Sequence, residues 1–288
     1  MSLARDHHEA EPLHGISVVS MAVNLPGPLA AARLESLGAA VTKVEPPDGD
    51  PAADISHDWY LDLIAGQDVV TLDLKRSRDR RRFDDLLDHA DLLLTASRPA
   101  ALARLRLSWQ ELHARFPLLC QVAIVGYGGG NEQVPGHDLT YQASTGVLNP
   151  PFMPRVLIAD VAGAERAATE ATALLLARAR GHESGYAQVS LARVAEDFAE
   201  SFRRGVTRSG GVLGGGHPGY KIYPCLDGYV AVAALEPHFW RRLLSDLGLD
   251  DQDEFVEAPL AAILKTQTRA YWEQWAAVRD LPLAALPT

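Results

Sequence analysis

Between Gly15 and about Gly130, short apolar and β-branched runs alternate with stretches of helical periodicity. Parallel strands need a long crossover between them, so this alternation is typical of βαβ units. We therefore predict an α/β fold with a doubly wound, mainly parallel sheet in a Rossmann-like large domain. The predicted strands cover residues 16–21, 40–44, 69–72, 91–95 and 118–124, and the predicted helices include residues 77–90 and the segment after Pro26-Gly27-Pro28.

The pattern changes after Gly130. Residues 163–180 and 191–204 are predicted to form long helices, with a strand at Tyr186–Ser190 between them. The glycine-rich segment 206–219 is typical of a linker or a mobile loop.

A second, smaller region follows the glycine-rich segment. Residues 221–225 and 229–233 are predicted to pair as a hairpin around Leu226-Asp227-Gly228. Glu236-Pro237 then opens a helix that runs through Leu247, since proline is tolerated in a first turn. We predict two domains, a large α/β domain over residues 1–205 and a small α+β domain over residues 206–288.

Charge limits the classes of partner. The 288 residues carry 27 Lys and Arg against 37 Asp and Glu, a formal net charge of −10. Because a general nucleic-acid binder needs a basic surface, this balance argues against nucleic acid as a partner. An anionic ligand would need a local basic patch.

The cysteine content and the chain termini bear on location. Cys120 and Cys225 are too few for a disulfide framework or a thiolate metal site, which favours a reducing compartment. Residues 1–11 lack the basic and apolar regions of a secretory signal, and no run approaches the roughly 18 apolar residues of a membrane span. We predict a soluble, cytoplasmic protein with no membrane partner.

No familiar short motif identifies the chemistry. The chain has no G-x-G-x-x-G after its first strand, no Walker lysine loop, no H-E-x-x-H and no G-x-S-x-G. Gly126-Tyr127-Gly128-Gly129-Gly130 follows a predicted strand, where bare backbone can approach a ligand. A tight turn would need the same glycines, and the two interpretations have similar weight.

Three titratable residues are candidates for catalysis. His137 lies in Gly136-His137-Asp138, and Asp160 lies in a short apolar run that leads into a long helix. A histidine and a carboxylate facing one carbon could exchange its proton between two faces. Asp160 could equally be a helix N-cap, His137 a solvated loop residue, and Glu236 a first-turn glutamate that interacts with the helix dipole.

Basic residues cluster between Lys75 and Arg106. Such a cluster can hold phosphates, although a basic run on one helix face is more often simply solvated. Lys75 and Arg98 lie beside predicted strand ends, where doubly wound folds bind ligands, and are the best candidates.

At these same residues the chain resembles the family III CoA transferases, also known as the CaiB/BaiF family, over nearly its whole length. Each matching block is weak alone, but six or more in the same order are specific. The blocks are Leu13-His14-Gly15-Ile16-Ser17-Val18-Val19 with Pro26-Gly27-Pro28; Leu37-Gly38-Ala39-Ala40-Val41-Thr42-Lys43-Val44-Glu45-Pro46-Pro47-Asp48-Gly49-Asp50; Leu72-Asp73-Leu74-Lys75; Ala90-Asp91 through Arg98-Pro99; and Gly126-Tyr127-Gly128.

Three further segments resemble the α-methylacyl-CoA racemase branch. They are Gly136-His137-Asp138, Ala159-Asp160-Val161-Ala162-Gly163, and Leu235-Glu236-Pro237-His238-Phe239-Trp240. The resemblance implies that His137 and Asp160 exchange the proton on the carbon α to a thioester carbonyl, and that Glu236 orients or tunes His137. Backbone N–H groups at the helix start beside Asp160 are expected to stabilise the enolate oxygen.

The resemblance also implies a site for the CoA thioester substrate, with no bound cofactor or metal, and an interlocked homodimer. The implied CoA-binding residues are Ala22, Val23, Asn24, Lys43, Lys75, Arg98, Arg104, Gly126 and Tyr127. Gly66-Gln67 stands where the family usually has a Gly-Lys pair, which removes one expected cation.

Three functions follow from these expectations. The first is racemisation or epimerisation of a 2-methylacyl-CoA by two-base proton exchange. The second is CoA transfer, with Asp160 as a nucleophile that carries the acyl group as a mixed anhydride. The third is a non-catalytic CoA-binding or interaction protein with the same fold.

Overall fold

Six parallel strands form the central sheet in the order β3-β2-β1-β4-β5-β6. A computed structural model describes residues 11–250 and 255–287. The strands are β1 (Ser17–Ser20), β2 (Ala40–Glu45), β3 (Asp68–Thr71), β4 (Leu92–Thr95), β5 (Cys120–Val125) and β6 (Tyr186–Ser190). This is the strand order of the Rossmann fold, so the predicted fold class is confirmed.

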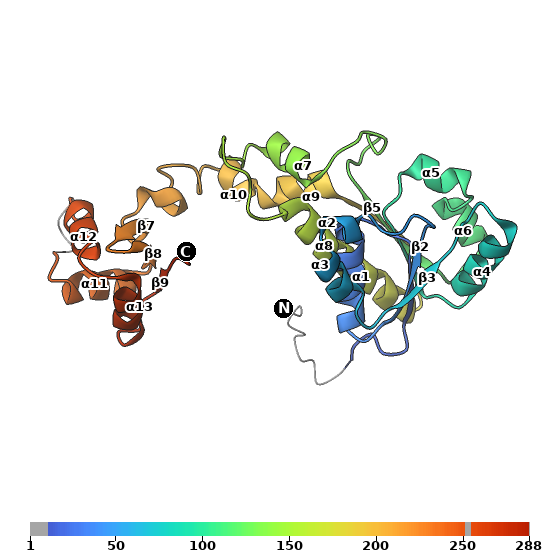
Figure 1. Ribbon diagram of the computed structural model, residues 1–288, viewed down its shortest axis with the longest axis horizontal. Helices are drawn as coiled ribbons and strands as arrows, with labels where there is room; N and C mark the ends of the chain where they lie inside the picture. The colour runs from blue at the N-terminus through green and yellow to red at the C-terminus, as the bar shows by residue number, and fades with distance from the viewer. Residues whose placement is uncertain (1–10, 251–254, 288) are drawn as a thin grey trace. The chain divides into compact units, whose positions relative to one another are not determined.

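Helices cover both faces of this sheet, because successive strand residues face opposite sides. Val18, Leu92 and Leu94 pack with α1 (Pro26–Ser36), α7 (Asp138–Thr145), α8 (Ile158–Ala179) and α9 (Leu191–Phe198). Val19 and Leu93 pack on the other face with α4 (Ser77–Asp88), α5 (Pro99–Arg104) and α6 (Trp109–Arg115). Figure 1 shows these two layers on either side of the sheet.

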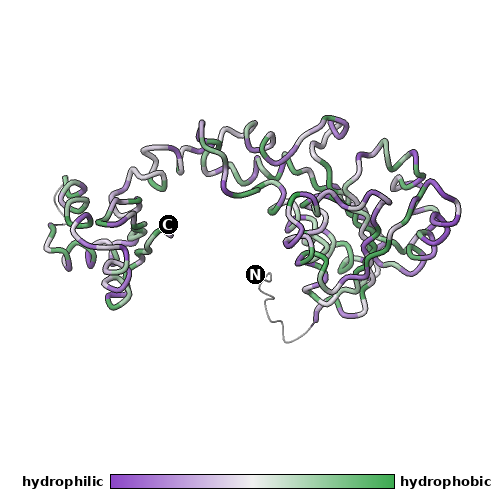
Figure 2. The backbone as a smooth tube through the Cα atoms, viewed as in Figure 1, coloured by the Kyte–Doolittle hydropathy of each residue, from purple (hydrophilic) through white to green (hydrophobic). Residues whose placement is uncertain are grey.

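Two short helices, α2 (Ala52–Ile55) and α3 (His57–Ile64), extend the first unit between β2 and β3. Tyr60 of α3 packs with Leu25 and Ala52 in a small cluster of their own. The arginine-rich helix α4 is one of the most hydrophilic segments of the tube in Figure 2, yet its Phe83 and Leu87 are buried against the sheet. Its remaining face is therefore solvated.

The chain divides into two compact units, Met1–Phe198 and Ala199–Thr288. This division, after Phe198, precedes the glycine-rich segment 206–219. The sequence predicts a domain boundary after residue 205, at the start of that segment, and this boundary stays a prediction. The segment contains a short helical turn, η1 (Val212–Gly216), preceded by α10 (Glu200–Arg203).

The second unit is built on an antiparallel sheet of order β7-β8-β9. Its strands are β7 (Tyr220–Cys225), β8 (Gly228–Ala233) and β9 (Leu283–Ala285), and its helices are α11 (Pro237–Asp246), α12 (Glu257–Leu264) and α13 (Arg269–Ala277). The predicted hairpin is confirmed, with Cys225 opposite Gly228. Trp272 and Trp275 of α13 pack with Val230 and Val232 against one face of this sheet.

Two predicted helices differ from the structure. The helix predicted over residues 163–180 begins five residues earlier, at Ile158, so Asp160 lies in its first turn and not in a strand-like run before it. The helix predicted over residues 191–204 is two helices, α9 and α10, which meet at Ala199.

Gly27 packs directly on the loop after β1. A Cβ at this position would lie 2.5 Å from Ala22 Cβ and 2.8 Å from the Ala22 carbonyl carbon. We expect Gly27→Ala to lower the free energy of unfolding by about 2 kcal/mol, because backbone must move to admit the methyl group. Chemical denaturation measures the change. Gly128→Ala is the control, since its Cβ would meet Ser190 Cβ at 3.4 Å; an equal loss in both variants would contradict the close-packing argument.

Candidate active site

A cavity of about 250 Å3 lies beyond the carboxyl ends of β1, β4 and β5. We call it the switch-point cavity, because the strand order reverses between β1 and β4 and open α/β sheets bind ligands there. The loop after each strand contributes to its wall. The lining residues are Val23, Asn24, Pro26, Ala96, Arg98, Ile124, Val125, Gly126, Glu132, Val134, Pro135, Gly136, His137, Tyr141, Asp160 and Leu191.

Asp160 is half-buried in the first turn of α8 and lines this cavity. Burial and, to a smaller extent, the nearby negative charge of Asp138 together raise the pKa of its carboxyl group to about 6. A carboxyl group with a pKa near neutrality can both accept and return a proton at physiological pH, which suits general acid–base chemistry.

The buried side chain of Asp138 joins α7 to α8. Its Oδ1 accepts the backbone N–H of Ala159 at 2.7 Å and that of Asp160 at 3.2 Å. Its Oδ2 accepts Gln142 Nε2 at 2.5 Å, and the same amide nitrogen donates to the Val156 carbonyl at 3.0 Å. Asp138 thus satisfies the open end of α8 from a different helix and fixes the backbone that carries Asp160.

These bonds correct one expectation. The first-turn N–H groups of Ala159 and Asp160 were expected to stabilise an enolate oxygen, but Asp138 accepts both of them. The N–H of Val161 donates to the Leu157 carbonyl. The donors for an oxyanion must come from elsewhere in the cavity.

His137 is the residue before α7 and is exposed at the cavity wall. Its backbone N–H donates to Thr140 Oγ1 at 3.0 Å, and that hydroxyl donates back to the His137 carbonyl at 2.8 Å. Because the next residue is Asp138, one short segment places His137 at the cavity wall and anchors the helix that carries Asp160.

The buried side chain of Tyr141 also lines the switch-point cavity. Its hydroxyl would lie 2.4 Å from a Cβ at Gly126, and its ring carbon Cε1 at 2.4 Å from a Cβ at Gly136, so neither position has room for a side chain. Burial raises the pKa of Tyr141 to about 12, with further contributions from Tyr127 and Asp160. The phenol therefore stays protonated and can donate a hydrogen bond.

Sequence reasoning did not select Asp138, Tyr141 or Glu132. All three occur within or beside the Gly136-His137-Asp138 motif, and the polar residues there were the available signal. Glu132 also lines the switch-point cavity, and its Oε1 accepts the Gly130 N–H at 3.1 Å.

A second cavity, of about 410 Å3, lies beyond the carboxyl ends of β2 and β3; we call it the β2–β3 cavity. Val23 lines both cavities, so the loop after β1 is their common wall. The lining residues are Met21, Val23, Val44, Glu45, Pro46, Pro47, Asp48, Leu72, Asp73, Leu74, Lys75, Ser97 and Leu105.

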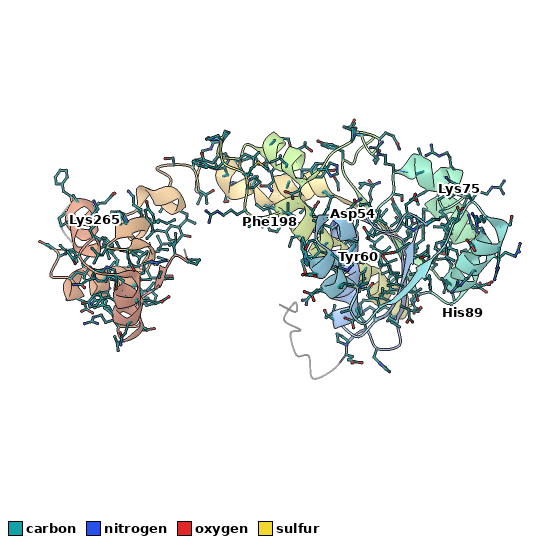
Figure 3. The ribbon with its side chains drawn as sticks, in the orientation of Figure 1. Asp54, Tyr60, Lys75, His89, Phe198 and Lys265 are labelled. Carbon is teal, nitrogen blue, oxygen red and sulfur yellow. The ribbon has the colours of Figure 1, made fainter. Side chains whose placement is uncertain are left out.

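The structure brings some of the expected CoA-binding residues to these cavities. Val23, Asn24, Arg98 and Gly126 line the switch-point cavity, and Lys75 lines the β2–β3 cavity and is exposed, as Figure 3 shows. Other expected residues line neither cavity. Ala22 is buried, Tyr127 packs edge-on against Tyr141, and Arg104 is exposed at the end of α5.

Lys43 does not line a cavity as expected, whereas Glu236 precedes a helix of the second unit as predicted. Lys43 is only 1% exposed and forms an ion pair with Asp50, with its Nζ 2.6 Å from Oδ2, so it does not reach either cavity. Glu236 belongs to the second unit, where it is the N-cap position of α11. The geometry above therefore concerns His137 and Asp160 without Glu236.

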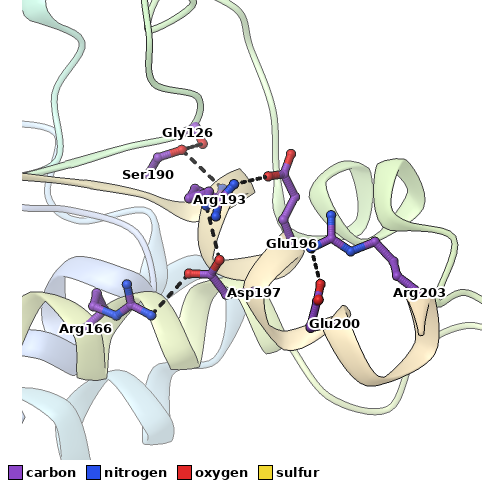
Figure 4. A network of polar contacts seen from close by, with 8 residues as sticks. All are labelled: Gly126, Arg166, Ser190, Arg193, Glu196, Asp197, Glu200 and Arg203. Carbon is purple, nitrogen blue, oxygen red and sulfur yellow. Dashed lines mark hydrogen bonds and ion pairs between the residues drawn. The ribbon is translucent and has the colours of Figure 1, made fainter. Parts of the chain in front are cut away.

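A polar network joins Gly126, which follows β5, to β6, α9 and α8 (Figure 4). Ser190 Oγ donates to the Gly126 carbonyl at 3.3 Å and accepts the Arg193 N–H at 3.3 Å. Asp197 then links Arg193 of α9 to Arg166 of α8. Exposed ion pairs stabilise little, but the backbone contact fixes the Gly126 end of the cavity.

Within the described ranges 11–250 and 255–287, no cluster of three His, Cys, Asp or Glu side chains could hold a metal ion. Among the helices of the described ranges, none combines the length and the apolar content needed to cross a membrane.

A model of CoA-transferase family III matches residues 13–288. The chain belongs to this family. It is 28% identical to the probable fatty acyl-CoA transferase Rv3272 of Mycobacterium tuberculosis, over 96% of this chain and 86% of that protein. A crystal structure of Rv3272 superposes with a TM-score of 0.84 at 27% identity and covers 97% of this chain and 86% of that one.

Both racemases and transferases are among the family members that match. Human alpha-methylacyl-CoA racemase is 31% identical over 91% of this chain and 74% of the racemase. Succinyl-CoA–D-citramalate CoA-transferase of Chloroflexus aurantiacus is 27% identical over 82% of this chain and 65% of that enzyme. The comparisons therefore establish a family III enzyme and leave the reaction to be argued from the site.

The raised pKa of Asp160 predicts a pH-dependent stability change. Since the folded-state pKa of about 6 exceeds the unfolded value near 3.9, ionising the buried carboxyl destabilises the fold as pH rises from about 4 to 6. We expect Asp160→Asn to raise the free energy of unfolding by about 1–2 kcal/mol at pH 7.5, a figure reduced for partial exposure, and to change it little at pH 4. Urea titrations at both pH values measure this. Glu183→Gln, an exposed charge loss, is the control; a pH-independent gain would contradict the burial argument.

Substitution of Asp138 should change the free energy of unfolding more than substitution of Asp160. We expect Asp138→Ala to lower the free energy of unfolding by about 2–4 kcal/mol, because two N–H groups at the start of α8 lose their acceptor. Asp138→Asn keeps an acceptor oxygen, should cost less, and should lower the pKa of Asp160 by removing a like charge. Denaturation and NMR titration of the Asp160 carboxyl carbon test both statements, and an unchanged pKa in Asp138→Asn would refute the second.

Proposed function

We propose that this family III chain acts on the carbon α to an acyl-CoA thioester and racemises or epimerises a 2-methylacyl-CoA by two-base proton exchange. The observation that carries the proposal is that His137 and Asp160 line one cavity at the switch point of the sheet. One base would remove the α-proton from one face of the carbon, and the other would return a proton to the opposite face.

The properties of the two groups support this division of work. Asp160 has a pKa of about 6, so near neutral pH its carboxyl group can take both the ionised form that removes a proton and the protonated form that returns one. The enolate formed between the two steps needs hydrogen-bond donors. Arg98 and the neutral phenol of Tyr141 line the same cavity and can supply them.

CoA transfer is the alternative. It requires Asp160 as an ionised nucleophile that attacks the thioester, and it has no need of His137. Burial raises the pKa of Asp160 to about 6, so the fraction of the ionised carboxylate that could act as a nucleophile falls as the pH drops through 6. A group that changes its protonation state in this range suits proton transfer. The pairing of this carboxyl with a histidine is therefore the reason to prefer racemisation.

Other parts of the proposal rest on the resemblance to the family. Glu236 as the residue that tunes His137 and the interlocked homodimer stay predictions, as does the cytoplasmic location expected from the cysteine content. The same holds for an acyl-CoA substrate without a bound cofactor.

Isotope exchange tests the two-base mechanism. Each enantiomer of a 2-methylacyl-CoA is incubated in D2O, and deuterium at the α-carbon is followed by mass spectrometry. We expect His137→Ala and Asp160→Asn each to reduce racemisation at least 100-fold, with exchange lost from opposite enantiomers, because each variant removes the base on one face. His182→Ala, an exposed histidine after α8, is the control. Unchanged exchange in both active-site variants would refute the proposal.

Two further measurements separate the alternatives. Hydroxylamine added during turnover would yield a hydroxamate only from an acyl-aspartyl enzyme, so trapping at Asp160 would establish transfer. Calorimetry with CoA and acetyl-CoA tests the non-catalytic interpretation, since a chain that binds neither is no acyl-CoA enzyme.

A further inference from the structure

A buried ionic cluster holds the loop that follows β1. Lys43, on β2, is among the largest fully buried side chains of the described residues. Its Nζ donates to Asp50 Oδ2 at 2.6 Å and to the Ala22 carbonyl at 3.4 Å, and lies 3.7 Å from Glu45 Oε1. Buried charges are costly unless they are paired and hydrogen-bonded, and this ammonium is both.

Asp50 passes this restraint to the loop backbone. Its side chain is fully buried, and its Oδ1 accepts the N–H of Asn24 at 2.9 Å and the N–H of Ala52 at 2.9 Å. The pair therefore fixes the loop at two points: Lys43 binds the Ala22 carbonyl, and Asp50 binds the Asn24 amide.

The restrained loop has an unusual backbone. Asn24 has a φ of 66°, in the left-handed region that residues other than glycine seldom adopt. Such conformations persist where the surroundings over-determine them, often at ligand sites. Leu25, the next residue, packs with Ala52 and with Tyr60, which Figure 3 labels on α3.

The loop is also the part of the chain that both cavities share. Val23 and Asn24 line the switch-point cavity, and Val23 lines the β2–β3 cavity as well. A shift of this loop would therefore change both cavities at once.

We propose that Lys43 and Asp50 are positioning residues for acyl-CoA binding, which hold residues 22–24 in the conformation that forms the common wall of the two cavities. Lys43 acts through Asp50 and the loop, and does not touch the ligand. A direct contact with a CoA phosphate would require the ammonium to leave Asp50 and expose a buried carboxylate. This inference rests on the proposed function for its ligand but not for its loop contacts.

The test compares direct contact with positioning. Binding of CoA is measured by calorimetry for Lys43→Met, Asp50→Asn and the double variant Lys43→Met/Asp50→Leu, and amide exchange is measured for the segment that contains Asn24. The double variant replaces an ion pair by apolar side chains, a change that often preserves folding. Lys265→Met, an exposed lysine labelled in Figure 3, is the charge-matched control.

If the residues position the loop, Lys43→Met, Asp50→Asn and the double variant each weaken CoA binding at least 10-fold relative to the unmodified protein. Exchange at the Asn24 amide rises at least 10-fold in the double variant, while Lys265→Met leaves it unchanged. The double variant retains its circular dichroism spectrum.

Two results would overturn the inference. One is a double variant that binds CoA as tightly as the unmodified protein. The other is an Asp50→Asn variant that binds CoA unchanged or more tightly while Lys43→Met loses binding, because this is the result of a direct phosphate contact. If the unmodified protein binds no CoA, the proposed function fails instead, and unchanged exchange at Asn24 in the double variant would then overturn the loop contact on its own.

Discussion

The arrangement of the site depends on the hydrogen bonds that the Asp138 carboxylate accepts. Asp138 is the first residue of one helix, α7, and its carboxylate accepts two N–H groups at the start of another, α8. Without it the first turn of α8 would have buried, unpaired donors, and Asp160 would not be held at the cavity wall that His137 also forms. The same negative charge adds to burial in raising the Asp160 pKa. One side chain thus fixes the backbone that carries Asp160 and adds to the raised pKa of its carboxyl group.

The electrostatics of the site follow from this arrangement. A net charge of −10 makes the chain a poor general host for an anion. Lys43 does not attract an anionic ligand, because the carboxylate of Asp50 neutralises its charge in the interior. Of the cations expected to bind CoA, the exposed Arg98 and Lys75 line the two cavities. Burial and the negative charge of Asp138, in contrast, raise the pKa of the Asp160 carboxyl group to about 6.

The fold was predictable because its signal is local. Apolar runs such as Leu92–Thr95 alternate with helical patterns, and the order of a parallel sheet constrains where strand ends meet. The start of α8 and the burial of Lys43 were not predictable, because carboxylates elsewhere in the chain determine both. Asp138 lies 21 residues before Ala159, whose N–H it accepts, and Asp50 lies across a loop from Lys43. A lysine beside a predicted strand end is indistinguishable in sequence from one that faces a ligand. The residue pattern and the resemblance likewise indicate Asp160 as a candidate, but neither indicates that Asp138 adds to its raised pKa.

The two anchoring carboxylates share a physical logic. Asp138 and Asp50 each use one oxygen for backbone N–H groups and the other for a side-chain donor, so each fixes a loop or helix end on one side of the switch-point cavity. Buried hydrogen-bonded charges tolerate little displacement, because any shift leaves a desolvated group unpaired. The bonds from these anchors reach the backbone N–H groups of the cavity-lining residues Asn24 and Asp160. It follows that the lining can change from proton exchange to acyl transfer while the anchors stay, and that substitutions at the anchors should impair either reaction equally.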